Sequence, residues 1–194
     1  MIRPVSLAAA GLCLLLAACS STPPQRHYTL GPVAEPAAAV SSATAGPSLV
    51  IGPVGVPEAI DRLQILRTVE GARAEVSEAN RWAGPLKDEI ARRLAGEIAR
   101  QRGFGRVVAW PQTSVVQPDL TLPVDVLRFE ARGFESVTLE AVWTLRQNGK
   151  DLASRRFAAT EAIAGGNYEG LAAAHGRLVD ALARDIAGAL PAGR

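Results

Sequence analysis

Residues 137–160 read VTLEAVWTLRQNGKDLASRRFAAT, a pattern typical of a β-hairpin. In the first half an apolar residue occupies every second position, as expected for a strand with one buried face. These alternating residues are Val137, Leu139, Ala141, Trp143 and Leu145. Asn148-Gly149 then supplies the residues that a tight type I′ turn requires, so the returning strand is expected at about 151–160.

The pattern leaves the register of this hairpin open. A two-residue turn places Arg146 opposite Asp151 and Leu145 opposite Leu152. Continued regularly, this pairing would place the apolar Phe157 on the face of Glu140, which conflicts with a single buried face. The sequence therefore predicts the hairpin but no particular register.

Two other segments have the apolar period of an α-helix. From Asn80 onward an apolar residue recurs every fourth position, and Gly103 follows as a natural C-cap, which predicts a helix from about Arg81 to Arg102. The residues that recur are Trp82, Leu86, Ile90, Leu94 and Ile98. Asn167 is placed as the N-cap of a second amphipathic helix. The inward face of that helix contains Tyr168, Leu171, His175, Leu178, Leu182 and Ile186.

The remaining apolar segments are short and are expected to be strands. They are residues 48–56, 63–69, 73–76, 107–110 and 120–129. The alternation in the last of these slips at Leu127, which predicts a β-bulge. One-sided helices and consecutive hairpins together predict an α+β fold, a mostly antiparallel sheet covered on one face by two amphipathic helices. One domain at 48–190 would hold these elements, followed by a tail at 191–194.

The N-terminus, MIRPVSLAAAGLCLLLAACSS, has a single cation at Arg3 followed by an apolar run. This run is shorter than the roughly 20 apolar residues that a membrane span needs, so residues 1–18 are predicted to be an export signal. The residues around Ala18 and Cys19 resemble a lipobox, with cleavage between the two. The alternative is an ordinary secretory signal in which Cys19 is incidental.

A processed Cys19 would carry diacylglycerol and an N-acyl chain such as palmitate, and no other cofactor is expected. Two acyl chains anchor a protein stably to a membrane. Ser20 follows the lipidated residue, and by resemblance to other bacterial lipoproteins it implies sorting to the periplasmic leaflet of the outer membrane. Cys13 lies within the signal, so no disulfide within the mature chain is expected.

Residues 19–47 are rich in Ser, Thr, Pro and Ala, a composition that predicts a lipidated tether. Residues 27–30 are the exception, since they could add a short strand to the sheet. The formal net charge is +2, with cations and acids interspersed along the chain. Nothing in this charge pattern indicates nucleic-acid binding.

The sequence offers few residues in patterns that carry chemistry. His27 and His175 are the only histidines and have no metal-ligand spacing around them, so no metal site is predicted. There is no G-x-S-x-G motif and no unmodified cysteine after processing, so we do not expect an enzyme. The three tryptophans could line a lipid or partner groove, but Trp82 and Trp143 follow the apolar period of their elements and are expected in the core.

Several segments match one family in order along nearly the whole mature chain. They are the lipobox at Cys19, Tyr28-Thr29-Leu30, residues 50–57, residues 60–65, residues 80–86 and the helix from Tyr168 to Leu190. In these segments the chain resembles the ABC-type transport auxiliary lipoproteins, the PqiC-like group found beside MCE-type lipid transport systems of Gram-negative envelopes.

The resemblance implies a non-enzymatic periplasmic protein, anchored in the outer membrane, that docks to an MCE-domain partner and helps to move phospholipid or related cargo. The ATPase and the permease would be separate proteins. Ring-like self-association would suit a partner shaped as a channel. Two rival classes stay open: a lipid carrier that encloses an acyl chain itself, and an assembly or pilot lipoprotein of a secretion or outer-membrane machine.

One loop, expected at 53–62, is the predicted contact with the partner. It contains several apolar residues in a segment rich in Gly and Pro. The residues predicted to touch the partner are Pro53, Val54, Val56, Pro57 and Ile60. The alternative is that these side chains cap the sheet.

Overall fold

The computed structural model describes residues 24–32, 46–102, 104, 106–112 and 114–191. In this part of the chain, the strands are β1 (Arg26–Tyr28), β2 (Leu49–Gly55), β3 (Gln64–Glu70), β4 (Arg73–Trp82), β5 (Val107–Ala109), β6 (Leu120–Arg132), β7 (Ser136–Gln147) and β8 (Lys150–Ala162). The α-helices are α2 (Leu86–Arg102) and α3 (Tyr168–Ala189), with short 3-10 helices at Glu58–Ile60 and Ala164–Gly166.

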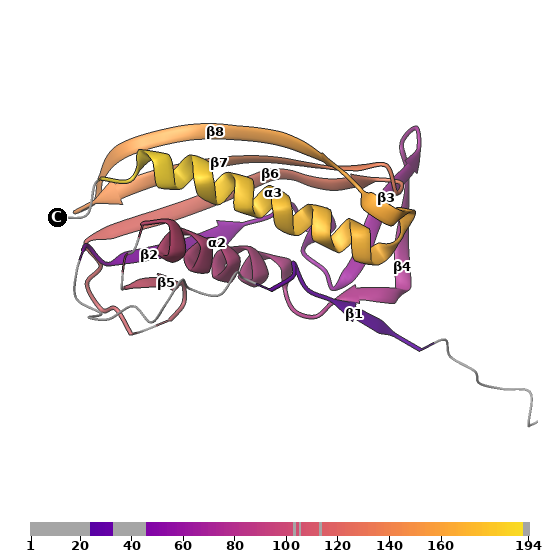
Figure 1. Ribbon diagram of the computed structural model, residues 1–194, viewed down its shortest axis with the longest axis horizontal. Helices are drawn as coiled ribbons and strands as arrows, with labels where there is room; N and C mark the ends of the chain where they lie inside the picture. Colours follow the sequence, from indigo (N-terminus) through magenta and orange to yellow (C-terminus); the bar gives the residue numbers. More distant parts are fainter. Residues whose placement is uncertain (1–23, 33–45, 103, 105, 113, 192–194) are drawn as a thin grey trace, which may run out of the picture.

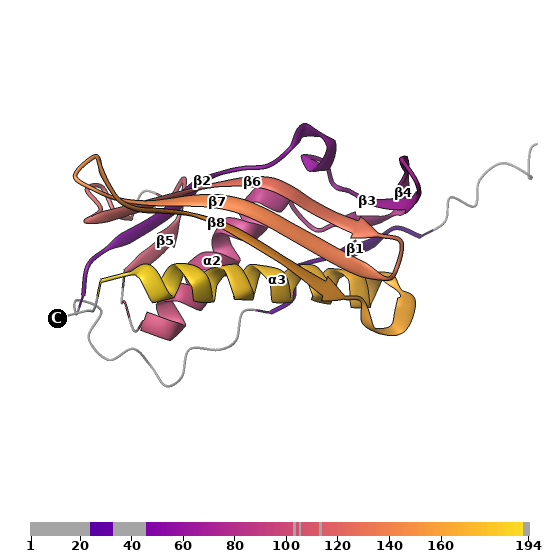
Figure 2. The ribbon, with the colours of Figure 1, turned by 90° about the horizontal axis from the view of Figure 1, so that it is seen from above.

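The strands form one eight-stranded mixed sheet, and both α-helices lie on the same face of it (Figure 1 and Figure 2). One edge of β6 is shared between β2 and β3, and its other edge pairs with β7. The longest ladders, β6 with β7 and β7 with β8, are antiparallel. The predicted α+β fold in a single domain is confirmed, although the parallel pairings of β2 with β5 and β6 were not anticipated.

The structure resolves the register of the β7–β8 hairpin. Arg146 pairs with Asp151 as predicted, but Leu152 is then an extra residue on β8. This bulge shifts the rest of the strand by one position and brings Phe157 opposite Ala141, where it packs against the core. A similar shift between Val126 and Arg128 confirms the bulge predicted in β6.

The first helix begins later than the sequence predicted. It starts at Leu86, and the residues from Arg81 to Trp82 belong to β4. These residues pair with β1, and the Trp82 N–H also donates to the carbonyl oxygen of Leu63 at 2.6 Å. The strand still buries Trp82, with 4% of it exposed. Trp82 is therefore a core residue as predicted, but it lies in a strand and not in the helix.

The second helix begins as predicted. The side chain of Asn167 accepts a hydrogen bond from the Gly170 N–H at 2.8 Å, the geometry of an N-cap. Within the described residues, neither helix combines the length and the apolar character that crossing a membrane would require.

His175 lies at the centre of the layer between sheet and helices. Its ring stands edge-on to Trp82 and Phe129, with centroids 5.2 and 4.5 Å away. Its Nδ1–H donates to the carbonyl oxygen of Leu171 at 2.9 Å, and only 3% of the residue is exposed. Burial lowers the pKa of His175 to about 4, so the imidazole is neutral in the folded protein at neutral pH.

The buried imidazole predicts a pH-dependent stability. Between its folded pKa and its unfolded value the unfolded chain binds a proton that the folded chain does not, so stability falls as the pH falls through this window. We expect His175 to contribute a loss of about 2 kcal/mol between pH 7 and pH 5. Urea unfolding of the wild type and of His175→Phe at both pH values measures it. A variant with the same pH slope as the wild type would contradict this prediction.

Candidate functional site

The chain enters the domain through β1, at the end of the tether. Ala18 and Cys19, the predicted cleavage and lipidation residues, lie outside the described residues. Cys19 is seven residues before Arg26, the first residue of β1, and seven residues span at most about 25 Å. If Cys19 carries the lipid, the domain is held within this distance of the membrane.

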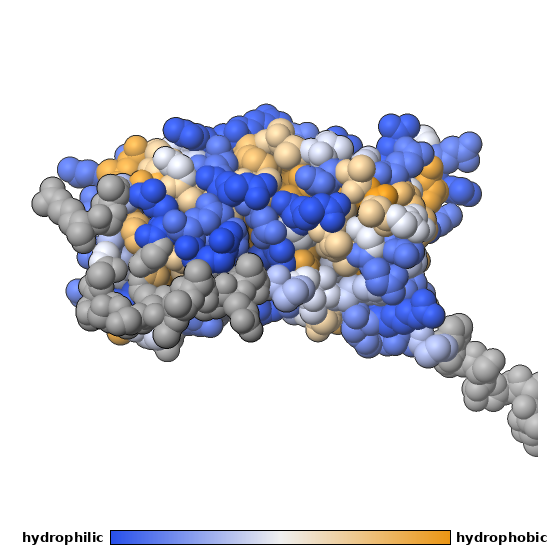
Figure 3. Space-filling model, viewed as in Figure 1, coloured by the Kyte–Doolittle hydropathy of each residue, from blue (hydrophilic) through white to orange (hydrophobic). Residues whose placement is uncertain are grey.

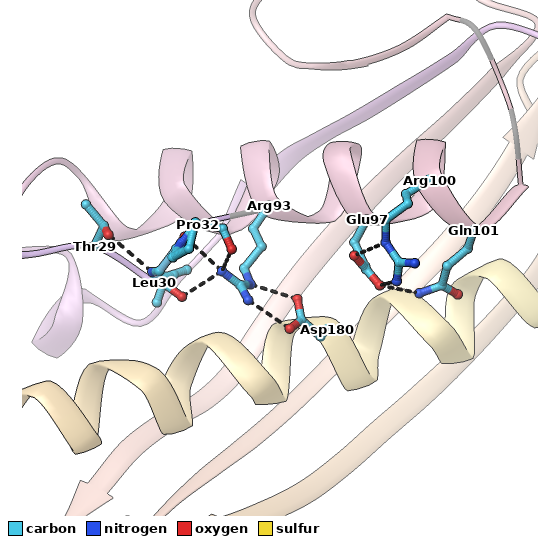
Figure 4. Close-up of polar contacts among 9 residues, drawn as sticks. Thr29, Leu30, Pro32, Arg93, Glu97, Arg100, Gln101 and Asp180 are labelled. Carbon is cyan, nitrogen blue, oxygen red and sulfur yellow. Dashed lines mark hydrogen bonds and ion pairs between the residues drawn. The ribbon is translucent and has the colours of Figure 1, made fainter. Parts of the chain in front are cut away.

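Arg93 of α2 forms hydrogen bonds with the segment that follows β1. The guanidinium donates to the carbonyl oxygens of Leu30 at 2.7 Å, Gly31 at 2.9 Å and Pro32 at 3.3 Å. It also donates two hydrogen bonds to Asp180 of α3, at 2.7 and 2.8 Å (Figure 4). We call this group the Arg93 clamp. It joins the N-terminal segment to both helices with a single side chain that is 11% exposed.

Close backbone packing accompanies the clamp. Gly176 of α3 lies directly against the carbonyl of Leu30, and a Cβ placed on this glycine would overlap the carbonyl oxygen. The same Cβ would lie 3.3 Å from the guanidinium carbon of Arg93. A glycine in the middle of a helix is unfavourable by itself, so its presence here reflects the space that the N-terminal segment needs.

Glu97 is a buried acid on α2, one turn beyond Arg93. It accepts hydrogen bonds from Arg100 and from Gln101, the latter at 2.8 Å (Figure 4). The hydrogen bond from Arg100 holds the pKa of Glu97 below its usual value, against the opposing effect of burial. A carboxylate that is kept charged and fully bonded is suited to holding α2 in place, and poorly suited to exchanging protons.

The other face of the sheet carries an apolar hollow of about 620 Å³. The hollow lies where β2, β5 and β6 meet the connection between β5 and β6. Its lining residues are Val50, Gly52, Pro53, Trp110, Pro111, Gln112, Val115, Val116, Pro118, Thr121, Pro123 and Arg146. Farther along this face the surface is polar, as in the ion pair of Arg156 with Glu140 at 2.6 Å.

The connection beside the hollow is fastened at both of its ends. The Trp110 N–H donates to the carbonyl oxygen of Ile51 at 2.8 Å. At the other end, the Asp119 carboxylate accepts from the backbone N–H and the hydroxyl of Ser48, at 2.8 and 2.6 Å. These two hydrogen bonds lower the pKa of Asp119 by stabilising its charged form.

β2 agrees with the strand predicted at 48–56 to within one residue at each end, and it overlaps the segment proposed for partner contact. It runs through Gly55, because Val54 pairs with Val124 of β6 beyond an irregularity at residues 52–53. The predicted loop at 53–62 therefore begins as a strand. A 3-10 helix at Glu58–Ile60 completes the connection to β3.

The five residues predicted to touch the partner are divided between core and surface. Ile60 is 8% exposed and lines a small internal space together with His175. Val54 and Val56 are partly buried and pack against the core, and Pro57 is also partly buried. Pro53 is exposed and lines the hollow.

Among the tryptophans, the sequence pattern separated core from surface correctly. Trp82 and Trp143 are 4% and 1% exposed, whereas Trp110 is 56% exposed at the hollow. Trp110 lies outside any apolar period, and this was the available signal for the hollow. His27 is exposed on β1 and His175 is buried, and no cluster of three metal-ligating side chains occurs in the part of the chain described.

The N-terminal entry at β1 and the apolar hollow lie far apart. β1, where the tether enters, and the connection at 110–119, beside the hollow, point toward opposite ends of the longest axis (Figure 1 and Figure 2). The helix side of the molecule is mostly hydrophilic over its middle (Figure 3). The protein is thus a one-sheet, one-helical-layer α+β domain that is entered at one end and carries an apolar hollow toward the other.

Comparison with known proteins identifies the family. A family model described as ABC-type transport auxiliary lipoprotein component matches residues 28–187, from β1 to the last turns of α3. The chain belongs to this family, as the resemblance implied. It is an auxiliary lipoprotein component of ABC-type transport, and this class of protein is anchored to an envelope membrane. Among curated proteins, no sequence matches it.

Two solved structures share the fold. A crystal structure titled as an uncharacterized protein has a TM-score of 0.68 and 19% identity, covering 86% of this chain and 98% of its own. A protein of the DUF330 family from Xanthomonas campestris has a TM-score of 0.57 and 18% identity, covering 87% of this chain and 86% of its own. At these identities the likeness establishes the fold alone.

The close packing at the Arg93 clamp predicts opposite effects for two glycines of α3. Gly176→Ala should lower the free energy of unfolding by about 2 kcal/mol, because the added methyl group meets backbone. Gly188 has open space around its Cβ position, so Gly188→Ala should raise it by about 0.5–1 kcal/mol through helix propensity. Urea unfolding of both variants measures the contrast. Equal effects would mean that the N-terminal segment does not pack on α3.

Proposed function

We propose that this protein is an outer-membrane-anchored periplasmic subunit of an MCE/ABC-type intermembrane lipid transport system. It docks to an MCE-domain protein and thereby supports envelope integrity. The observation that carries the proposal is the family match over residues 28–187, which includes β2 to β8, all of α2 and all of α3 except its last two residues. Diacylglycerol and an N-acyl chain on Cys19 provide the anchor, and Ser20 directs the protein to the outer membrane.

In this proposal the protein acts by recognition. The acyl chains keep the domain at the membrane. The residues from Cys19 to Arg26, which we call the leash, restrict the domain to a thin layer of the periplasm. This restriction raises its effective concentration for a partner that reaches the same layer. Pairing of β1 with β4 fixes the end of the leash at Arg26, and the Arg93 clamp holds residues 30–32, which follow β1, against the helices.

The contact residues proposed from the sequence can be ranked by exposure. Pro53 is open to a partner, and Val54, Val56 and Pro57 are partly accessible. Ile60 supports the connection from within the core, so its role in contact would be indirect. A channel-shaped partner would be matched by a ring of copies of this chain, which a measurement of copy number would reveal.

A second candidate is a lipid carrier, and the apolar hollow favours it. A space of about 620 Å³ on the exposed face of the sheet could receive part of an acyl chain. The carrier would hold lipid after purification without any protein partner, which separates it from the docking function.

Purification of the tagged lipoprotein from its native envelope tests the main proposal. After brief crosslinking and extraction in mild detergent, mass spectrometry should identify an MCE-domain protein together with acyl mass on Cys19. Recovery of stoichiometric phospholipid without that partner would favour the carrier. Secretion or outer-membrane assembly components would favour a pilot lipoprotein and contradict the transport role.

Changes at the processing site test the anchor separately. Cys19→Ala should move the protein out of the membrane fraction, because no residue is then left to carry the acyl chains. Ser20→Asp should retain the lipidated protein in the inner membrane. Density-gradient fractionation of the envelope measures both. An unchanged outer-membrane position in the two variants would rule out Cys19 as the anchor and Ser20 as the sorting residue.

A further inference from the structure

Two large apolar side chains at the hollow are exposed to solvent. Val116 is 88% exposed and Trp110 is 56% exposed, both on the connection between β5 and β6. Exposing apolar surface to water costs about 25 cal/mol per Å². Exposed apolar side chains that lie close together therefore mark interaction surfaces. Tryptophan in particular is enriched among the residues that dominate binding energy at protein interfaces.

The two ends of the connection are held in place before any ligand binds. Its hydrogen bonds from Trp110 to Ile51 and from Ser48 to Asp119 anchor both ends to β2. A surface that is already ordered loses little conformational entropy when a partner binds. This is the behaviour expected of a docking surface.

The charges around the hollow argue against a lipid headgroup. Among the residues that line it, Arg146 is the one cation. Its Nε–H donates to Asp151, at 2.7 Å, across the β7–β8 turn, so this cation already has an acidic partner. A phospholipid would place an anionic phosphate beside a hollow whose one lining cation is paired, whereas a neutral apolar protein segment leaves no charge unpaired.

The register of the sheet places the hollow far from the tether. Arg26 of β1 is aligned, through β4 and β3, with about Phe129 of β6, while the hollow is aligned with Thr121. Residues 121–129 extend about 25 Å along the strand. The leash from Cys19 to Arg26 has about the same maximum length. Only a fully extended leash, lying along the sheet, would bring a lipid anchored at Cys19 to the hollow.

We propose that the hollow is the docking site for the transport partner and receives an uncharged segment of that protein, with an apolar side chain seated between Trp110, Val116 and Pro53. This proposal rests on the proposed function, because it assigns a surface to the same partner. The anchored end then remains at the membrane, and the hollow is presented to a protein that approaches through the periplasm.

Site-specific photocrosslinking in the native envelope tests the assignment. A benzophenone amino acid replaces Val116 in one strain and Leu127 in another. Leu127 is the matched control, since it is an exposed apolar residue, 48% accessible, in the β6 bulge and outside the hollow. We expect the probe at 116, and not the probe at 127, to crosslink to the MCE-domain protein that co-purifies with the wild type.

Charge substitutions at the same two positions give an independent readout. Val116→Asp should reduce recovery of the MCE-domain protein about tenfold or more, as expected when a central apolar contact is lost. Leu127→Asp should leave the recovery unchanged. Both side chains are exposed, so equal melting temperatures of the two variants would confirm that the fold is intact.

Each outcome bears on a different claim. Crosslinks to the MCE-domain protein at other positions but not at 116 would overturn this inference and leave the proposed function standing. A crosslink from 116 to phospholipid would identify a lipid site, and one to a second copy of this chain would identify a self-association surface. If the wild type recovers no MCE-domain protein at all, the proposed function itself fails.

Discussion

The sheet has one apolar face, and covering it is the constraint on which the other features of the protein depend. Long strands such as β6 and β7 alternate buried and accessible residues, and the buried set needs a second layer. α2 and α3 provide that layer, with His175 neutral at its centre. Because both helices are on one side, the opposite face is left open, and the hollow forms there.

The Arg93 clamp attaches the segment that follows β1 to the helical layer. A single guanidinium joins Asp180 of α3 to three carbonyl oxygens of residues 30–32, so the segment directly after β1 is fastened to both helices. Removing Arg93 would leave Asp180 without its ion pair and the carbonyls without donors. The proposed leash ends at Arg26, where β1 pairs with β4, and its length limits the distance between β1 and the membrane.

Local patterns in the sequence predicted the helices, the long strands and the N-cap at Asn167, because each depends on residues close together in the chain. The predicted start of α2 was wrong, because Trp82 is held in β4 by its pairing with β1, which is distant in the sequence. The bulge at Leu152 likewise depends on pairing between strands, and the parallel pairings of β2 with β5 and β6 join segments far apart in the chain. The hollow combines residues from four separate segments, so no local pattern contained it, and Trp110 was its one visible sign.

The distance of each end of the domain from the bilayer tests the central claim most directly. Arg26→Cys and Val116→Cys variants of the protein can be spin-labelled in vesicles that carry nickel-chelating lipids. If Cys19 is acylated and Cys13 is removed with the signal, as proposed, the introduced cysteine is the thiol that takes the label. The structure predicts strong relaxation enhancement by surface nickel at position 26 and weak enhancement at position 116. Stronger enhancement at 116 would place the hollow against the membrane and contradict its assignment to a partner from the periplasm.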